Sequence, residues 1–223
     1  MRRVRSLVAV PPLTNIVVGT HQPGFAGARG MARLAALCVC ALAWGLVDFG
    51  LLLWLPADLV AHGYTMGVSS KLLAQSALIA CPTVFLAALL YSRWSSKWSL
   101  VTMIGVTLLG LILIVRLQAG IGGPVLPIAM LIVGTNGIIA TVSPYAAESF
   151  SLGVRGRATG LVAACTKVGG LLAQSLSIMG LVPSIGVTAI AIMVPTSLAL
   201  SLIAWFGIDT KGRDLRDLEP RTP

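Results

Sequence analysis

Apolar residues gather along this chain in six long runs, separated by short polar segments. Crossing a hydrocarbon core of ~30 Å takes about 20 residues of helix, and each run has about that length. The pattern therefore predicts an all-α, polytopic membrane protein with six transmembrane helices. The expected spans are residues 34–56, 72–92, 98–117, 124–147, 160–182 and 185–206, which together make one transmembrane domain over residues 31–207.

Composition supports a membrane protein and argues against a soluble one. Hydrophobic residues make up 57% of the chain and charged residues 10%, whereas soluble domains contain about 25% charged residues. The net charge of +9 would suit nucleic acid if the basic residues formed one solvated stripe, but they are distributed among the loops. We therefore expect membrane lipid, and no nucleic acid, as a partner.

Strongly basic loops alternate with nearly uncharged ones, which predicts the orientation of the chain. By the positive-inside rule the basic side is the cytoplasm, so both termini are expected there, in the plasma membrane or, in a bacterium, the inner membrane. Residues 1–30 are then expected to be a disordered cytoplasmic leader and residues 208–223 a cytoplasmic tail. The basic side holds Arg29, Arg33, Arg93, Lys97, Arg155, Arg157, Lys211, Arg213, Arg216 and Arg221, and the other side holds Lys71 and Arg116.

No catalytic or metal-binding constellation is recognisable in the sequence. The four cysteines lie inside spans, where a thiol behaves as a small hydrophobe, and the two histidines, His21 and His62, lie outside them. An intramembrane nucleophile would therefore lack a base, and a zinc motif would lack its ligands. We expect neither an enzyme nor a bound metal or cofactor.

Four polar residues inside the expected spans are candidates for binding a solute or an ion. Asp48 lies near the middle of the first span and Lys167 about two turns into the fifth; ionisable groups at such depth are costly and are functional by default. Gln174 follows Lys167 by seven residues on the same helical face, and Asn136 lies on a polar face of the fourth span. A structural role is the alternative: Asp48 and Lys167 would pair or snorkel to fix helix packing, and Asn136 would make interhelical hydrogen bonds.

Small residues and prolines predict local features of the helices. Gly169, Ala173 and Ser177 recur at four-residue spacing, which is typical of a close helix contact in membranes. Prolines inside spans predict kinks or breaks, and they occur at Pro82, Pro127, Pro144 and Pro195.

Three stretches, in order along the chain, resemble motifs of one transporter family. They are Trp54-Leu55-Pro56 followed by Leu59 and Gly63, Glu148 followed after six residues by Arg155-Gly156, and Asp209-Thr210-Lys211-Gly212-Arg213 in the tail. Over residues 33–219 the chain thus resembles the major facilitator superfamily, in the branch of sugar porters and metabolite:proton symporters.

The chain departs from that family in motif detail and in length. Residues 91–97 keep two cations but lack the family's Asp and Gly, and Asp209 stands where the family has Glu. The family has twelve spans in two halves, whereas this chain shows six. The resemblance therefore implies a carboxy-terminal half, with a second six-span half as its partner, either a separate chain or another copy of itself.

Glu148 is expected to form a latch on the cytoplasmic side. It ends a span, where the helix dipole disfavours an anion, so Arg155, Arg157 or both should compensate it through charge-assisted bonds. Asp209 and Asp214 of the tail are near enough in topology to join this cluster. Such a latch, which the resemblance also implies, would hold one state of an alternating-access cycle.

These observations predict transmembrane transport of a small organic solute, coupled to protons, by a secondary transporter. Lys167 suggests that the solute is an organic anion, and Asp48 is the candidate for carrying the proton. Two alternatives stay open. The chain would be a truncated, non-transporting membrane protein or an assembly or regulatory subunit, or it would be a six-span channel.

Overall fold

The computed structural model describes residues 27–61, 63 and 65–210 of the chain. Over these residues the chain forms α-helices and one π-helical turn, η1, and contains no strand. The elements are α1 (Gly27–Leu46), η1 (Val47–Leu51), α2 (Leu52–Ala61), α3 (Met66–Ala80), α4 (Thr83–Arg93), α5 (Ser96–Gln118), α6 (Val125–Glu148), α7 (Leu152–Ile178) and α8 (Ile185–Phe206).

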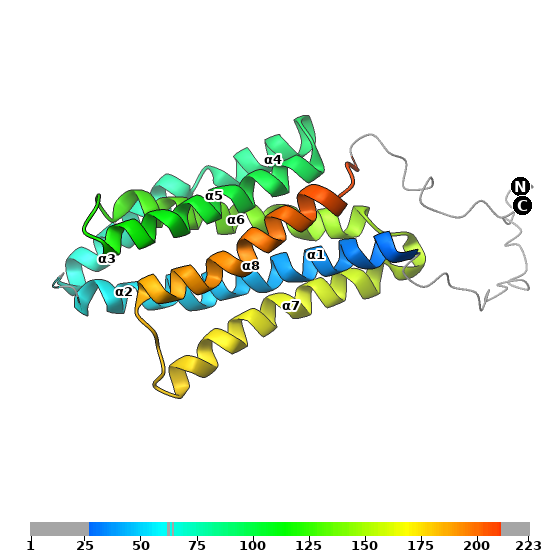
Figure 1. Ribbon diagram of the computed structural model, residues 1–223. Helices are drawn as coiled ribbons and strands as arrows, with labels where there is room; N and C mark the ends of the chain where they lie inside the picture. The colour runs from blue at the N-terminus through cyan, green and yellow to red at the C-terminus, as the bar shows by residue number, and fades with distance from the viewer. Residues whose placement is uncertain (1–26, 62, 64, 211–223) are drawn as a thin grey trace, which may run out of the picture.

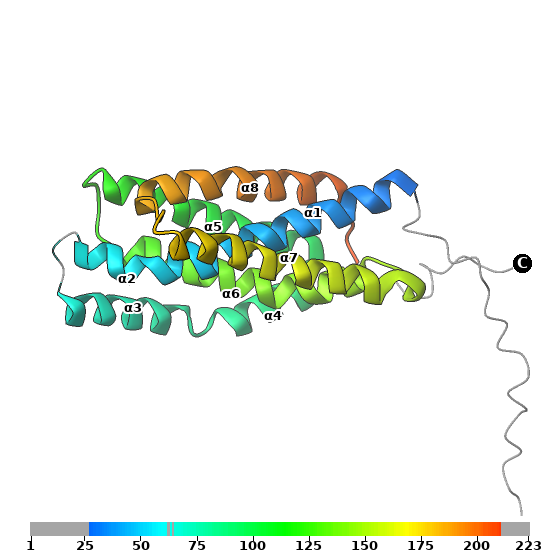
Figure 2. The same ribbon diagram turned by 90° about the horizontal axis from the view of Figure 1, so that it is seen from below.

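The helices lie lengthwise beside one another in a single bundle (Figure 1). The most extensive contacts join α5 to α6 and α8, and α1 to α7 and α8. Figure 2 shows α3 and α4 end to end along one side of the bundle, with α8 on the opposite side. Both α3 and α4 pack on α6.

Within the described residues, five helical segments are long and apolar enough to cross a membrane, which makes this a multi-pass membrane protein. They are the continuous segment Gly27–Ala61 and the helices α5, α6, α7 and α8. For α5, with 23 residues, a rise of 1.5 Å per residue gives a length of about 35 Å. The predicted spans 98–117, 124–147 and 185–206 match α5, α6 and α8 to within two residues at each end.

The expected span over residues 72–92 is not one helix, and it is interrupted at Pro82, one of the prolines predicted to kink or break a span. The helical conformation is interrupted at Cys81 and Pro82. The helices on either side, α3 and α4, have 15 and 11 residues, and each is too short to cross a membrane alone. Proline removes a backbone donor and its ring clashes with the carbonyl four residues earlier. Helices α6 and α8, by contrast, continue through Pro144 and Pro195.

Two predicted boundaries also need correction. Helix α7 begins at Leu152 and not at residue 160, so Arg155 and Arg157 lie in its first turns and not in a loop. Helix α1 begins at Gly27, so the last four residues of the expected leader are helical. The remainder of that leader and tail residues 211–223 lie outside the described residues.

The small residues of α7 allow α1 to approach closely, as their spacing predicts. A Cβ added at Gly45 of α1 would overlap the carbonyl oxygen of Thr166, and one added at Gly169 would overlap that of Leu42. One turn along, a Cβ on Gly50 would lie 3.0 Å from the Cβ of Ala173. The close contact predicted from Gly169 and Ala173 is therefore confirmed.

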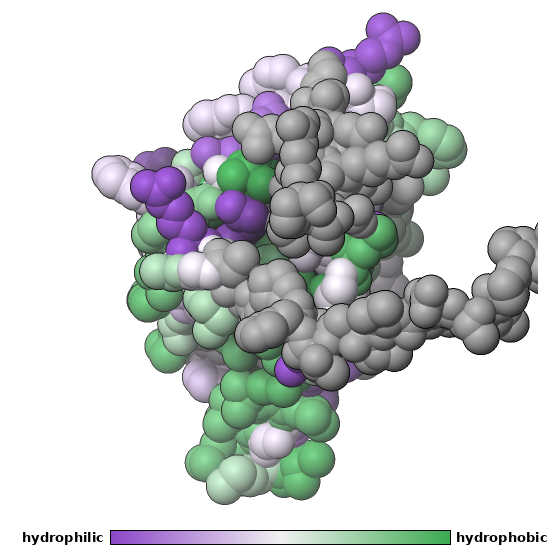
Figure 3. All heavy atoms as spheres, turned by 90° about the vertical axis from the view of Figure 1, so that its right-hand side faces the viewer, coloured by the Kyte–Doolittle hydropathy of each residue, from purple (hydrophilic) through white to green (hydrophobic). Residues whose placement is uncertain are grey.

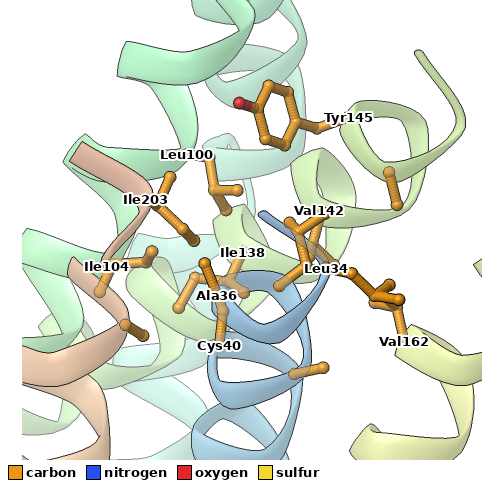
Figure 4. Close-up of a cluster of buried hydrophobic side chains, with 14 of the residues drawn as sticks. Leu34, Ala36, Cys40, Leu100, Ile104, Ile138, Val142, Tyr145, Val162 and Ile203 are labelled. Atoms are coloured by element: carbon orange, nitrogen blue, oxygen red, sulfur yellow. The ribbon is translucent and has the colours of Figure 1, made fainter. Parts of the chain in front are cut away.

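Apolar side chains of six helices, α1 and α4 to α8, fill the bundle on the side where α6 ends. Figure 4 shows this cluster, in which side chains from α1, α5, α6, α7 and α8 meet. Tyr145 lies at its margin and is fully buried. A second apolar cluster fills the other end, between η1, α2, α5, α6 and α8.

Candidate functional site

The π turn η1 places Asp48 and Phe49 on the side of α1 that faces α7. Its five residues, Val47–Leu51, interrupt the regular α-helical pattern in the middle of a continuous helical segment. The amide Nε2 of Gln174 on α7 donates a hydrogen bond to the carbonyl oxygen of Phe49. Single π turns inside α-helices occur frequently at functional sites, and this one is bonded by Gln174 at the residue that follows Asp48.

Lys167 lies seven residues before Gln174, on the same face of α7, and is close to the same π turn. Its ammonium Nζ is 5.3 Å from the centroid of the Phe49 ring, a cation–π distance. Its charge also interacts with the carboxylate of Asp48. Lys167 is exposed on the bundle surface, whereas Asp48 is half-buried. The structure thus assembles Asp48, Lys167 and Gln174 around Phe49, and we call these four residues the mid-bundle site.

Trp44 connects the mid-bundle site to α6. The indole Nε1 donates a hydrogen bond of 2.9 Å to the carbonyl oxygen of Thr135. Its ring makes an edge-to-face contact with the ring of Phe49, with centroids 5.8 Å apart. Asn136 follows Thr135 directly, is half-buried and has no side-chain hydrogen bond to another described residue. It is therefore adjacent to the site through the backbone of α6 but does not join the group on α1 and α7.

Glu148 forms a second polar cluster where α6 ends. Its Oε2 accepts hydrogen bonds from the hydroxyls of Tyr91 at 2.6 Å, Thr210 at 2.6 Å and Ser96 at 3.5 Å. The donors come from the last turn of α4, the first residue of α5 and the segment after α8. We call this set of four residues the end cluster. Three hydroxyl dipoles thus compensate an anion that the dipole of its own helix disfavours.

Arg155 and Arg157, the two cations expected to compensate Glu148, make no hydrogen bond to its carboxylate among the described residues. Arg155 is half-buried, and its Nε and Nη2 have no hydrogen-bond partner among the described residues. Arg157 and Asp209 are exposed, and Asp209 directly precedes Thr210. Asp214 lies outside the described residues. The predicted ion pair between Glu148 and Arg155 is therefore not formed in this structure.

Two further hydrogen bonds tie the chain together at the same end. The guanidinium of Arg33 on α1 donates from Nη1 to the carbonyl oxygen of Ser149 at 3.0 Å. The hydroxyl of Tyr145 donates to the carbonyl oxygen of Ile208 at 2.8 Å, which holds the segment after α8 against α6. Figure 3 looks onto this end and shows hydrophilic side chains gathered around it, while the surface of α7 below is apolar.

Basic residues collect at this end of the bundle, as their alternation along the chain predicts. The start of α1, the end of α4 and the starts of α5 and α7 all lie here, next to the end of α6. They bring Arg29, Arg33, Arg93, Lys97, Arg155 and Arg157 to one end. Lys71 lies near the start of α3 and Arg116 near the end of α5, and both of these helix ends are at the other end of the bundle.

The residues that contact Glu148 and the aromatic pair at the mid-bundle site are not predicted from the sequence. Tyr91, Ser96 and Thr210 are separated from Glu148 by more than 50 residues, and hydroxyls at helix ends carry no charge signal. Trp44 offered a signal, because it precedes Asp48 by one helical turn and its indole N–H needs an acceptor when buried.

Among the described residues, no group of three His, Cys, Asp or Glu side chains is placed to hold a metal ion. Comparison of the chain with protein-family models, with curated proteins and with solved structures gives no match.

Proposed function

We propose that this chain is the carboxy-terminal, six-span half of a secondary transporter of the major facilitator type, which moves a small organic anion together with protons. The observation that carries the proposal is the mid-bundle site: a carboxylate and an ammonium, Asp48 and Lys167, beside a π turn inside a membrane-spanning segment. Ionisable groups at that depth mark substrate or proton pathways in membrane proteins. Their partner Gln174 adds an amide that can hydrogen-bond a solute as well as Phe49.

The chemistry of the mid-bundle site suits an anionic solute. Lys167 is exposed and supplies a positive charge, and the Phe49 ring beside it supplies an apolar contact. When a solute carboxylate approaches Lys167, it competes with Asp48 for the same ammonium. Protonation of Asp48 would release Lys167 for the solute, so proton and anion binding would favour each other. This competition gives a physical route to symport.

The end cluster supplies a contact that differs between two states of an alternating-access cycle. In the state described, Glu148 is bound by the hydroxyls of Tyr91, Ser96 and Thr210. In the other state Glu148 pairs with Arg155, whose guanidinium has unpaired donors among the described residues. Exchange of hydroxyl partners for a cation would then accompany movement of α7 relative to α6.

A lone half exposes the mid-bundle site, so the complete transporter needs a second six-span half. Lys167 would otherwise face lipid, and a charge at the centre of a membrane helix costs about 2.5 to 3.5 kcal/mol on the insertion scale. A partner half would cover this face and supply the opposite wall of the site.

Flux measured in liposomes tests this proposal. The chain should be reconstituted with and without a co-expressed first half, and uptake of labelled organic anions should be followed with and without a proton gradient. Saturable, gradient-driven uptake only with both halves supports the proposal. Ohmic current would indicate a channel, and no flux in either sample would favour the truncated or regulatory alternative.

Two variants of Lys167 then test the role of the site itself. In the active two-half sample Lys167→Ala should reduce uptake to background, because the anion loses its counter-charge. Lys167→Arg keeps the charge with a different geometry and should retain part of the uptake. Full uptake by Lys167→Ala would leave this lysine with a packing role and would contradict the proposed anion contact.

A further inference from the structure

A cavity of about 150 Å³ opens where α7 and α8 lie against the continuous segment Gly27–Ala61. None of the side chains that line it carries a charge, and none belongs to the mid-bundle site or the end cluster. The cavity therefore suits an uncharged, mainly apolar ligand. Its walls include Leu46 and Trp54 of that segment, Leu176 of α7, and Val187, Thr188 and Ala191 of α8.

Trp54 supplies a hydrogen-bond donor that has no acceptor. Its indole Nε1 is shielded from solvent and has no hydrogen-bond partner among the described residues. A covered donor without an acceptor is destabilising, and a buried indole N–H usually finds a partner. Thr188, the other wall residue with a polar side chain, already donates its hydroxyl hydrogen to the carbonyl oxygen of Ser184 at 3.1 Å. The group that needs a partner is thus a donor, so the ligand should carry an acceptor.

Trp54 lies at the depth of the membrane where lipid carbonyls are found. Arg33 of the same segment bonds the carbonyl oxygen of Ser149, directly after the end of α6. At a rise of 1.5 Å per residue, Trp54 is about 30 Å farther along the segment. A hydrocarbon core of ~30 Å that begins near Arg33 therefore ends near Trp54, at an interface where tryptophan is enriched. The ester carbonyls of glycerolipids lie at this boundary between hydrocarbon and headgroups.

Exposed apolar side chains lead from the cavity toward the middle of the bundle. Residues three or four apart share one face of a helix, so these side chains form a continuous stripe on each of α7 and α8. Figure 1 shows the two helices diverging toward the loop that joins them, which is the end where the cavity lies. A hydrocarbon chain that leaves the cavity would follow these stripes. They consist of Leu176, Leu172 and Val168 on α7, and of Val187, Ile190 and Val194 on α8.

We propose that this cavity binds the ester end of one acyl chain of a glycerophospholipid, whose carbonyl oxygen accepts the hydrogen bond of Trp54. An ester carbonyl is a neutral acceptor, whereas a phosphate among these uncharged walls would lack a counter-charge. At about 30 Å³ per water-sized group, 150 Å³ holds roughly five groups, which are the carbonyl and the first methylenes. Rotation of the indole about its Cβ–Cγ bond, a torsion with broad wells, brings the N–H to the carbonyl. The site requires only a membrane protein, so it does not depend on the transport proposed above.

Two lipids that differ in this carbonyl test the proposal on the unaltered chain. Dioleoylphosphatidylcholine has ester carbonyls, and its dioleyl ether analogue has the same headgroup and chain length but only ether oxygens, which are weaker acceptors. Each lipid should be titrated into the whole chain in detergent, and native mass spectrometry should measure how many lipids bind and how tightly. We expect one saturable site for the ester lipid and an affinity about 3- to 10-fold lower for the ether lipid, because a neutral hydrogen bond is lost.

Substitution of Trp54 then locates this difference at the indole. Trp54→Phe keeps an apolar ring without the N–H. It should lower the affinity for the ester lipid to that for the ether lipid and leave the affinity for the ether lipid unchanged. Trp205→Phe removes an exposed indole at the opposite end of the bundle and should change neither affinity.

Filling the cavity tests where the lipid binds. Ala191→Trp places an indole in the cavity and should abolish saturable binding of both lipids. Ile112→Trp, exposed on α5 and outside the cavity walls, should not. Equal affinities of the two lipids for the unaltered chain would overturn the proposal. So would the absence of a saturable site, saturable binding that persists in Ala191→Trp, or a preference for the ester lipid that persists in Trp54→Phe.

Discussion

The half-buried carboxylate of Glu148 shows how hydroxyl groups can compensate an anion at the end of a helix. It lies at the C-terminal end of α6, where the helix dipole opposes it, and its compensation comes from hydroxyl donors on three other segments. Hydrogen bonds to a charged group contribute about 1.5 to 3 kcal/mol, so each of the two short bonds is significant. The end cluster therefore couples α4 and the segment after α8 to α6.

A double-mutant cycle between Glu148 and Tyr91 measures this coupling. Tyr91→Phe removes the donor and should lower the free energy of unfolding by about 1 to 3 kcal/mol. In the Glu148→Gln background the same substitution should cost about 1 kcal/mol less, because the charged partner is already absent. Unfolding in mixed detergent micelles, without solute, provides the measurement.

Arg155 supplies the matched control for that cycle. Its guanidinium makes no contact with Glu148 in this structure, so Arg155→Ala and Glu148→Gln should be additive to within about 0.5 kcal/mol. A large coupling for Arg155 combined with none for Tyr91 would mean that the ion pair, and not the hydroxyl cluster, dominates in the resting protein.

At the scale of helices, the contact between α1 and α7 depends on glycines that admit a neighbouring backbone. Gly45 and Gly169 face each other across the crossing, and a Cβ on either would overlap a carbonyl oxygen of the other helix. Backbone cannot rotate away as a side chain can, so the two helices would have to separate. This crossing also positions Gln174 and Lys167 against the π turn.

Gly169→Ala should therefore destabilise the bundle, and Gly160→Ala on the same helix should not. Overpacking of a tight contact costs about 1 to 3 kcal/mol, whereas a Cβ at Gly160 meets no atom within 4 Å. Both substitutions raise helix propensity equally, so their difference isolates the contact. Thermal unfolding in detergent compares them, and equal midpoints would refute the close contact.

The helices that the sequence predicts well are those whose ends are determined by residues within the helix or next to it. Apolar length alone predicts α5, α6 and α8 well, because glycine, proline or polar residues end these runs sharply. Pro82 predicts a kink or a break, and the length of the run does not distinguish between the two, whereas the structure shows a break. The start of α7 was placed eight residues late because Arg155 and Arg157 resemble loop residues when only hydropathy is considered.

The candidate site divides in the same way. Asp48, Lys167 and Gln174 were found from their cost in a membrane, and their assembly on one side of α1 and α7 agrees with the helical spacing of Lys167 and Gln174. The π turn is not predictable from the residues around it. The hydrogen bond to the carbonyl oxygen of Phe49 comes from Gln174, which is 125 positions away in the sequence. The hydroxyl partners of Glu148 were missed for the same reason.

For the whole molecule, the gathering of six basic residues at one end makes the orientation testable. The positive-inside rule predicts that this end, with both chain termini, faces the cytoplasm. Gly153 and Gly122 are exposed at opposite ends of the bundle and suit single-cysteine labelling in a variant without the native cysteines. An impermeant reagent applied to intact cells should label a cysteine at position 122 and not one at position 153. The reverse pattern would invert the topology.

The exposed Lys167 also bears on which partner completes the bundle. If two copies of this chain paired through the mid-bundle site, the two-fold axis would bring each Lys167 toward its symmetry mate, and like charges at such a contact repel. Pairing with a different half avoids this, since that half can place an anionic or neutral group opposite. We therefore expect the purified chain to have the mass of a monomer in detergent and to show no saturable solute uptake alone.

Lys167→Gln should increase self-association, because it removes the repulsion while keeping a polar side chain of similar length, whereas Lys97→Gln, at the end of the bundle, should not. Light scattering or analytical ultracentrifugation of the three proteins over a range of concentrations measures the difference. A stable dimer of the unaltered chain that transports solute driven by a proton gradient would show that the chain pairs with itself and would refute the need for a different half.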